Sequence, residues 1–214
     1  MRWRRAAADG LGTALLLAAV VGSGIMGERL SQGNDALALL ANSLATGFAL
    51  AALIVAFAPR SGAHFNPVVT LVLAWRGEFA KRDVLPYIAM QFLGALAGVA
   101  AAHLMFDLPI VQYSVKARSS LGLWWSEVVA TFGLLLVVLS CDAKRAWAAP
   151  LAVSAYIAAA YWFTASTSFA NPAVTLARGF SNTFAGIDLA HVLPFIGAQL
   201  LGAALALLAD RYLR

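Results

Sequence analysis

Two Asn-Pro pairs are the residues of this sequence best suited to contact a solute. The block Asn-Pro-Val-Val-Thr-Leu at 66–71 returns as Asn-Pro-Ala-Val-Thr-Leu at 171–176, with five of six residues identical and an offset of 105 positions. Asparagine is a strong helix N-cap, because its side-chain oxygen accepts from backbone N–H groups, and proline fits the first helical position. The amide nitrogens then remain as donors beside the positive end of a helix dipole. The pattern predicts a site that repels cations and donates to neutral, oxygen-bearing solutes.

Two acids lie in otherwise apolar segments and share a spacing to threonine. Asp9-x-x-x-Thr13 near the N-terminus corresponds to Glu127-x-x-x-Thr131 in the second half of the chain. An acid inside a membrane span is by default functional or paired. We expect both carboxylates to hold structure by hydrogen bonds, with an exposed interfacial position as the alternative for Asp9.

Residues for catalysis or metal binding are scarce. His64, His103 and His191 do not have a metal-ligand spacing, and no nucleotide-binding loop is found. The single cysteine, Cys141, excludes an internal disulfide and a thiolate cluster. The sequence therefore predicts no enzyme, no metal site and no cofactor. We expect His103 and His191 at the membrane interface and His64 in a re-entrant loop.

The elements that position these residues are membrane spans. Of 214 residues, 62% are hydrophobic and 12% charged, with mean hydropathy +0.80, which excludes a water-soluble fold. Two short apolar segments, Asn66–Trp75 and Asn171–Phe180, are too short to cross a core about 30 Å thick and predict re-entrant half-helices. Six runs of span length are predicted at Gly10–Gly27, Ala36–Ala58, Val84–Phe106, Leu121–Ser140, Trp147–Ala165 and Leu189–Ala209.

Basic residues give the orientation of the spans. Eleven Lys and Arg fall on the side that holds both termini, among them Lys144 and Arg214, and four fall on the other side. The positive-inside rule then predicts cytoplasmic termini. The net charge of +5 is explained by these flanks, so we expect no nucleic-acid partner.

The two halves of the chain form an inverted repeat. A second block, with Gln91 and Gly94, returns 108 positions later with Gln199 and Gly202. Each repeat holds three spans, an odd number, so the second half must enter the bilayer from the opposite face. This predicts two half-helices whose Asn-Pro ends meet near the midplane. Small residues at Gly94, Gly98 and Gly202 allow close helix contacts, within one chain or between chains.

At these motifs the sequence resembles the major intrinsic protein family of aquaporins and aquaglyceroporins over essentially its whole length. The resemblance rests on Ser-Gly-Ala-His-Phe-Asn-Pro-Val at 61–68, on the second Asn-Pro-Ala, on the acid-x-x-x-Thr pairs and on the glutamine blocks. It implies an all-α membrane fold of six tilted helices and two half-helices, in a single channel domain over 1–214 with repeats at about 1–112 and 119–214. It also implies one pore per chain and a homotetramer.

The family's site roles transfer to matching positions. Asp9 and Glu127 resemble the acids that hold the re-entrant loops, although the family usually has glutamate at the first position. The resemblance places at the pore centre Asn66, Pro67, Val68, Asn171, Pro172 and Ala173. It places the pore-lining carbonyls at Gly62, Ala63, His64, Ser168, Phe169 and Ala170.

The outer constriction departs from the usual family pattern. Counting from the two asparagines, its four positions are Thr46, Ala159, Ser168 and Val174. The usual arginine is absent and Val174 replaces it, so we expect a wider ring with fewer donors. Ala159 rests on an ungapped count, and Tyr156 or Tyr161 could point inward instead. Arg178, one helical turn after Val174, is expected to face the mouth or a neighbour.

This filter is similar to that of aquaglyceroporins associated with bacterial arsenic resistance. The resemblance implies a passive channel, in a bacterial inner membrane, for small uncharged solutes: arsenite, methylarsenite and antimonite as hydroxides, with glycerol and water. A glycerol or water channel without a metalloid role is the alternative. A secondary transporter built on inverted repeats is a more distant one, since the acids other than Asp9 and Glu127 fall in predicted loops or at ends.

Overall fold

The computed structural model describes residues 2–141, 145 and 147–213, and the regular structure of these residues is helical. Lys144 and Arg214, which the charge count uses, lie outside the described residues. Short 3-10 turns, Lys81–Asp83 and Leu189–His191, lead into the fourth and last helices. The helices are α1 Arg2–Leu30, α2 Asp35–Ser61, α3 Pro67–Trp75, α4 Val84–Met105, α5 Leu121–Ser140, α6 Ala148–Phe163, α7 Pro172–Arg178 and α8 Val192–Leu213.

The helices follow the predicted spans, with the main differences at α1 and α6. Among the described residues, five helices are long and apolar enough to cross a membrane: α1, α2, α4, α5 and α8. The first of them begins at Arg2, well before the predicted Gly10, because alanines, the best helix formers, occupy positions 6–8. Helix α6 has 16 residues, about 24 Å, and is shorter than the predicted Trp147–Ala165.

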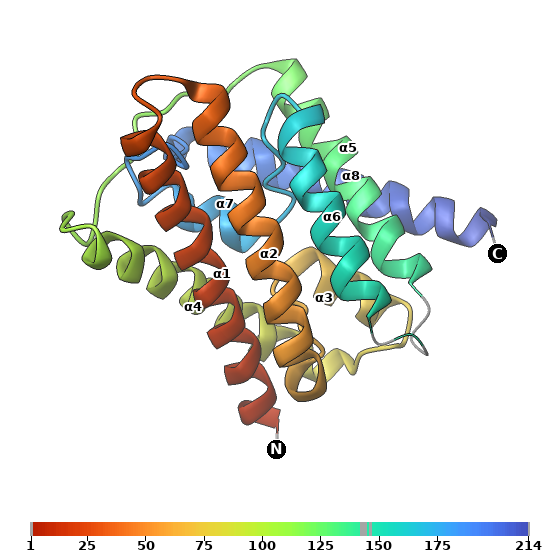
Figure 1. Cartoon of the computed structure of the whole chain (residues 1–214). Coiled ribbons are helices and arrows are strands. Elements are labelled where there is room, and N and C mark those ends of the chain that lie inside the picture. Colours follow the sequence, from red (N-terminus) through yellow and green to blue (C-terminus); the bar gives the residue numbers. More distant parts are fainter. Residues whose placement is uncertain (1, 142–144, 146, 214) are drawn as a thin grey trace.

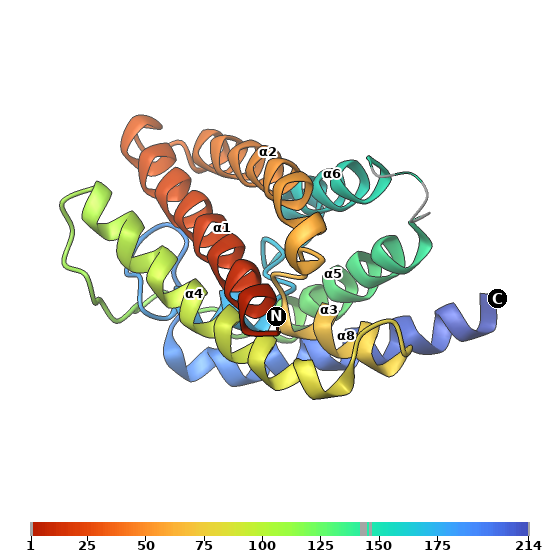
Figure 2. The same cartoon turned by 90° about the horizontal axis from the view of Figure 1, so that it is seen from below.

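The long helices surround the two short ones. Seen along the bundle, α1, α2, α6, α5, α8 and α4 follow one another around α3 and α7 (Figure 2). Helix α1 packs mainly on α4 and α2, and α5 packs mainly on α8 and α6, so the two halves repeat the same arrangement. Helix α3 lies toward the end that holds the N-terminus and α7 lies beyond it (Figure 1). The short helices therefore approach each other from opposite ends of the bundle.

Glycines let the main helix pairs approach within one chain. A Cβ on Gly94 of α4 would lie 2.0 Å from the carbonyl oxygen of Gly10 in α1, and one on Gly98 would lie 2.1 Å from that of Ala14. A Cβ on Gly202 of α8 would lie 2.5 Å from the carbonyl oxygen of Val128 in α5. Only glycine permits such close contact, so the small-residue motifs of the sequence serve packing inside the chain.

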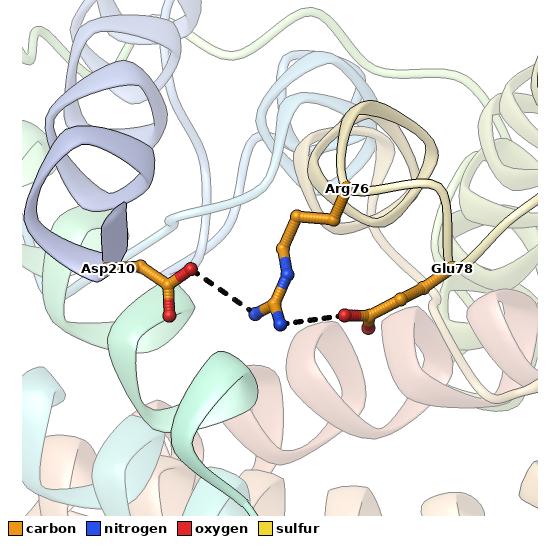
Figure 3. Close-up of polar contacts among 3 residues, drawn as sticks. All are labelled: Arg76, Glu78 and Asp210. Carbon is orange, nitrogen blue, oxygen red and sulfur yellow. Dashed lines mark ion pairs between the residues drawn. The ribbon is translucent and has the colours of Figure 1, made fainter. Parts of the chain in front are cut away.

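An ion-pair cluster joins the end of α3 to the end of α8. The Arg76 guanidinium lies 2.7 Å from a carboxylate oxygen of Glu78 and 3.5 Å from one of Asp210 (Figure 3). Arg76 directly follows α3, and Asp210 lies in the last turn of α8. The cluster fixes the far end of the first short helix, opposite its Asn-Pro start.

Candidate functional site

The two Asn-Pro pairs begin the two short helices. The Asn66 side-chain oxygen accepts from the backbone N–H of Val68 at 3.0 Å. The Asn171 oxygen accepts from the N–H groups of Ala173 at 3.0 Å and Val174 at 3.3 Å. Pro67 and Pro172 are the first helical residues. Both asparagines are therefore N-caps whose oxygens are occupied and whose amide groups point away from the helix start.

Each asparagine also crosses to the opposite loop. The Asn66 amide nitrogen donates to the carbonyl oxygen of Ala170, and the Asn171 amide nitrogen donates to that of Phe65, both at 2.8 Å. The sequence predicted that these nitrogens stay free. The structure corrects this for one of the two N–H groups of each amide. That N–H joins the two loops, because the two Asn-Pro ends lie in contact. The other N–H of each amide remains available to a solute.

Two buried carboxylates hold the loops that precede the short helices. Asp9 accepts from the Ser61 hydroxyl, the backbone N–H groups of His64 and Phe65, and the Gln91 amide, at 2.7–3.0 Å. Its side chain has no solvent exposure, so the interfacial alternative for Asp9 does not hold. Each carboxylate oxygen accepts two hydrogen bonds, which satisfies a buried charge without a basic partner.

Glu127 repeats this arrangement in the second half. It accepts from the Ser166 hydroxyl, the N–H groups of Phe169 and Ala170, and the Gln199 amide, at 2.6–2.9 Å. Because these acids accept the loop N–H groups, the loop carbonyls are turned to the other side.

Left-handed backbone shapes both loops in the same way. Ala63 and Phe65 have φ of 51°, and Ser168 and Ala170 have φ of 51° and 47°. Non-glycine residues in this region cost of order 1–3 kcal/mol each and persist only where the surroundings hold them. Here the carboxylates of Asp9 in α1 and Glu127 in α5 hold the loops in this conformation. With Gly62 at φ 90° and Thr167 at φ 63°, three of the four residues before each asparagine are left-handed.

A cavity of about 150 Å³ is lined by residues of both loops. One wall is the backbone of the two loops, from Gly62 to Asn66 and from Ser168 to Asn171. The opposite wall is mostly apolar and comes from α1, α2, α5 and α6, with side chains such as Leu16, Leu50 and Ile157. A row of acceptors facing an apolar wall suits small solutes that carry O–H groups and have no net charge. Among the described residues, no group of three or more His, Cys, Asp or Glu could hold a metal ion.

Comparisons with known proteins agree with this geometry. The family model described as major intrinsic protein matches residues 1–164. The chain is 53% identical to aquaglyceroporin AqpS of Rhizobium meliloti (strain 1021) over 210 residues, 98% of this chain and 90% of that protein. It is 29% identical to aquaporin Z of Bradyrhizobium diazoefficiens over 100% of this chain and 94% of that one.

The chain belongs to the major intrinsic protein family. It is therefore a membrane channel and not an enzyme, and the predicted fold class is confirmed. The X-ray structure of the aquaglyceroporin from Plasmodium falciparum has the same fold, with a TM-score of 0.75, 20% identity, and coverage of 98% of this chain and 96% of that one.

The outer end of the channel cavity differs from the sequence prediction at one position. Thr46, Ser168 and Val174 line the cavity, whereas Ala159 is exposed on the outer side of α6. Tyr161 lines the cavity instead, with its hydroxyl 3.3 Å from that of Thr46. Placing Ala159 in the filter was wrong, because the ungapped count set the helical phase two residues off. The alternative that Tyr161 points inward is the one the cavity lining favours.

The other tyrosine that was left open points elsewhere. The Tyr156 hydroxyl donates to the carbonyl oxygens of Val129 and Ala130 in α5, at 3.4 and 3.2 Å. It also fills the space beside Gly133, where a Cβ would lie 2.1 Å from the hydroxyl oxygen. Tyr156 therefore joins α6 to α5, and Tyr161 alone of these two residues reaches the cavity.

Two further residues lie where the sequence did not predict them. Arg178, expected at the mouth or against a neighbour, is 2% exposed and lines the cavity one helical turn after Val174. His103, in the last turn of α4, is fully buried, with one ring nitrogen 2.9 Å from the Ile110 carbonyl and the other 2.9 Å from the Ser181 hydroxyl, so it does not face lipid or water. His191 is half-buried and accepts from the Arg118 N–H at 3.2 Å. No spacing rule flagged these loop contacts, because they join segments far apart in the chain.

Proposed function

We propose that the chain is a passive channel for small uncharged solutes, among them trivalent metalloid hydroxides such as arsenite, methylarsenite and antimonite, together with glycerol and water. The observation that carries this proposal is Val174 in the cavity wall, at the position where family members usually have arginine. An isopropyl group there removes a guanidinium and its donors from the ring. Solutes larger than water then meet a less polar and less narrow passage.

The corrected ring still favours this reading. Tyr161 makes the ring narrower than four small residues would, but its hydroxyl and that of Thr46 supply polar contacts on one side. Val174 leaves the other side apolar. A polyol or a metalloid trihydroxide has O–H groups and an uncharged centre. Its O–H groups can bond the hydroxyls on one side of the ring while its uncharged centre passes Val174 on the other.

The proposal assigns roles to the predicted site residues. Asn66 and Asn171 donate their remaining N–H groups to the passing solute at the centre, with the two helix dipoles opposing cations. Asp9 and Glu127 hold the loops that carry the carbonyls. The proposed centre comprises Asn66, Pro67, Val68, Asn171, Pro172 and Ala173, and the proposed carbonyl row comprises Gly62, Ala63, His64, Ser168, Phe169 and Ala170. The proposed filter comprises Thr46, Tyr161, Ser168 and Val174.

Assembly and orientation are part of the same proposal. We place a single channel domain over 1–214, with repeats at about 1–112 and 119–214, in a bacterial inner membrane with both termini cytoplasmic, and we expect a homotetramer. The exposed apolar side chains Leu40, Leu44 and Phe48 on one face of α2 support burial by lipid or neighbouring subunits. Cross-linking in membranes and mass measurement in mild detergent test the tetramer.

The direct test is solute flux through the purified protein in proteoliposomes. Stopped-flow light scattering compares water with glycerol, and elemental analysis measures arsenite uptake, with Val174→Arg as the variant. We expect rapid entry of glycerol and arsenite, which Val174→Arg reduces about tenfold, while water flux is reduced less. The guanidinium narrows the ring and so raises the barrier for the larger solutes by about 1.4 kcal/mol.

The outcomes separate the alternatives. Glycerol and water flux without arsenite flux would leave a glycerol channel with no metalloid role. Water flux alone would show that residues other than the proposed filter set the width. Uptake that saturates and depends on an ion gradient would favour a transporter over a channel.

A further inference from the structure

The last residue of α7 is an arginine that lines the cavity one helical turn beyond Val174. Arg178 follows Val174 by four positions, and residues four apart lie on the same face of a helix. Both residues line the cavity, together with Tyr161 and Ser168. The arginine that the family position lacks is thus replaced by one displaced outward along the same helix.

The Arg178 side chain is held firmly in this place. Its guanidinium carbon lies 3.4 Å from the centre of the Phe169 ring, and its Nε donates to the carbonyl oxygen of Ala185. Phe169 in turn packs edge-on against Phe195, with ring centres 5.2 Å apart. A guanidinium stacked on a ring and bound at Nε is pre-organised, so it keeps its position as solutes pass.

No carboxylate neutralises this charge at close range. Among the described residues, Arg178 has no ion pair within 4 Å, and the acid of this half, Glu127, is occupied by four hydrogen bonds. Arg118 adds a second guanidinium, 5.0 Å from the same Phe169 ring. Burial, and then the charges of Arg118 and Arg178, lower the pKa of Lys116 in the adjoining loop. The outer end of the cavity is therefore electropositive.

Donors remain on the guanidinium for a solute. Of its five N–H groups, the Nε group is bound to Ala185, and no hydrogen bond from the terminal nitrogens is found among the described residues. Ser168, across the same cavity, has a buried hydroxyl without a hydrogen-bond partner in the described part of the chain. The two side chains offer a passing solute both donors and an acceptor.

We propose that Arg178 is the specificity-determining residue of the outer constriction: it excludes protons and metal cations by its charge and donates to oxygen-bearing neutral solutes, while Val174 leaves the ring wide. This inference rests on the proposed channel function. A single arginine at the usual position would select by both size and charge. Here the two roles fall on two residues one helical turn apart: Val174 sets the width and Arg178 carries the charge.

The test is ion leak through Arg178→Gln, with Arg118→Gln as the matched control. Arg118 is also buried against Phe169, but it does not line the cavity and instead donates to the carbonyl oxygens of Ser166 and Gly186. Proteoliposomes with a pH-sensitive dye and a potassium gradient report proton and potassium flux, and glycerol flux reports a folded channel. We expect Arg178→Gln to raise ion flux about tenfold or more with glycerol flux retained, and Arg118→Gln to raise ion flux far less, because its charge does not line the cavity.

Two further variants keep the inference testable if Arg178→Gln does not fold. Phe169→Leu removes the ring under the guanidinium but no hydrogen bond, since Phe169 bonds Glu127 through its backbone; we expect it to leak ions. Adding Val174→Arg to Arg178→Gln is expected to restore exclusion. A glycerol-conducting Arg178→Gln or Phe169→Leu variant that stays ion-tight would overturn the inference and leave the channel function standing. Absence of glycerol and arsenite flux in the unchanged protein would instead contradict the proposed range of solutes.

Discussion

The two halves of the molecule hold their re-entrant loops with the same four donors but with acids of different length. Asp9 and Glu127 each accept from one serine, two loop N–H groups and one glutamine. Aspartate is one methylene shorter than glutamate, yet its hydrogen bonds are of similar length. The first half must therefore bring its helix closer to the loop.

Glycines lie where α1 meets α4 and the first loop. In the first half Gly94 faces Gly10, and a Cβ on Gly94 would lie 2.0 Å from the Gly10 oxygen. In the second half Gly202 faces Val128, at 2.5 Å in the same measure. The Gly12 position lies against the Phe65 ring, where a Cβ would be 2.1 Å away. In this comparison the half with the shorter acid also has the closer glycine contacts, and the hydrogen bonds to the loop have similar lengths in both halves.

Removing either acid should have the largest effect. In Asp9→Ala and in Glu127→Ala, two loop N–H groups and two side-chain donors lose their acceptor, and each buried unpaired donor costs about 1–3 kcal/mol. We expect a loss of stability on the order of 3 kcal/mol or more and no glycerol flux, measured by thermal unfolding in detergent and by stopped flow. Glu28→Ala, an exposed acid at the end of α1, serves as the control. A variant of either buried acid as stable as this control would show that the carboxylate does not hold its loop.

Adding a methyl group between the helices should cost less and should differ between the halves. Gly94→Ala and Gly202→Ala both overpack a close crossing, for which about 1–3 kcal/mol is typical, and we expect the larger loss at Gly94 because its space is smaller. Gly197→Ala in α8 is the control, since nothing lies within 4 Å of its Cβ position. Thermal unfolding of the three variants gives the order. Equal losses at Gly94 and Gly202 would contradict the difference in helix spacing.

Exchanging the acids tests the coupling directly. Asp9→Glu adds a methylene where the helices are close, and Glu127→Asp leaves the second loop out of reach, so we expect each to lose about 1–2 kcal/mol. A wider spacing between α1 and α4 should make room for the longer glutamate side chain at position 9. The double variant Asp9→Glu with Gly94→Ala is therefore expected to lose less than the sum of its single changes, in a double-mutant cycle on unfolding free energy. Strict additivity would show that acid length and helix spacing are independent.

The far ends of the two short helices should give the smallest effects. Arg76, after α3, is held by ion pairs, whereas Ser181, after α7, bonds the buried His103 ring. We expect Ser181→Ala to lose about 1 kcal/mol independently of salt, because a buried nitrogen loses its partner. Arg76→Gln should lose less than about 1 kcal/mol, and less still in high salt. Unfolding at two salt concentrations checks both, and a salt effect at Ser181 would contradict this assignment.

Much of the fold could be predicted from the sequence. Apolar runs of span length, the two Asn-Pro caps and the repeated glutamine blocks depend on hydropathy and on local spacing, which the chain carries directly. The acids Asp9 and Glu127 were found because a charge is costly inside a span and must be paired. The family match and the helix order agree with these inferences.

The filter was harder to predict, because it depends on contacts across the molecule. Tyr161 replaces Ala159 at the cavity since the loop between α6 and α7 sets a phase that counting residues cannot give. No pattern in the sequence around Arg178 predicted that its guanidinium would stack on Phe169 and bond the Ala185 carbonyl.

The sequence by itself determined the membrane spans, the inverted repeat and the capped half-helices, because each follows from residues close together in the chain or from its own repetition. Only the tertiary structure decided which side chains face the cavity, how close α1 lies to α4, and that Arg178 lines the cavity with its guanidinium on the Phe169 ring. Those features depend on helix phase and packing distance, and a shift of one or two residues, or of about one methylene, changes them while leaving the pattern of hydropathy unaltered.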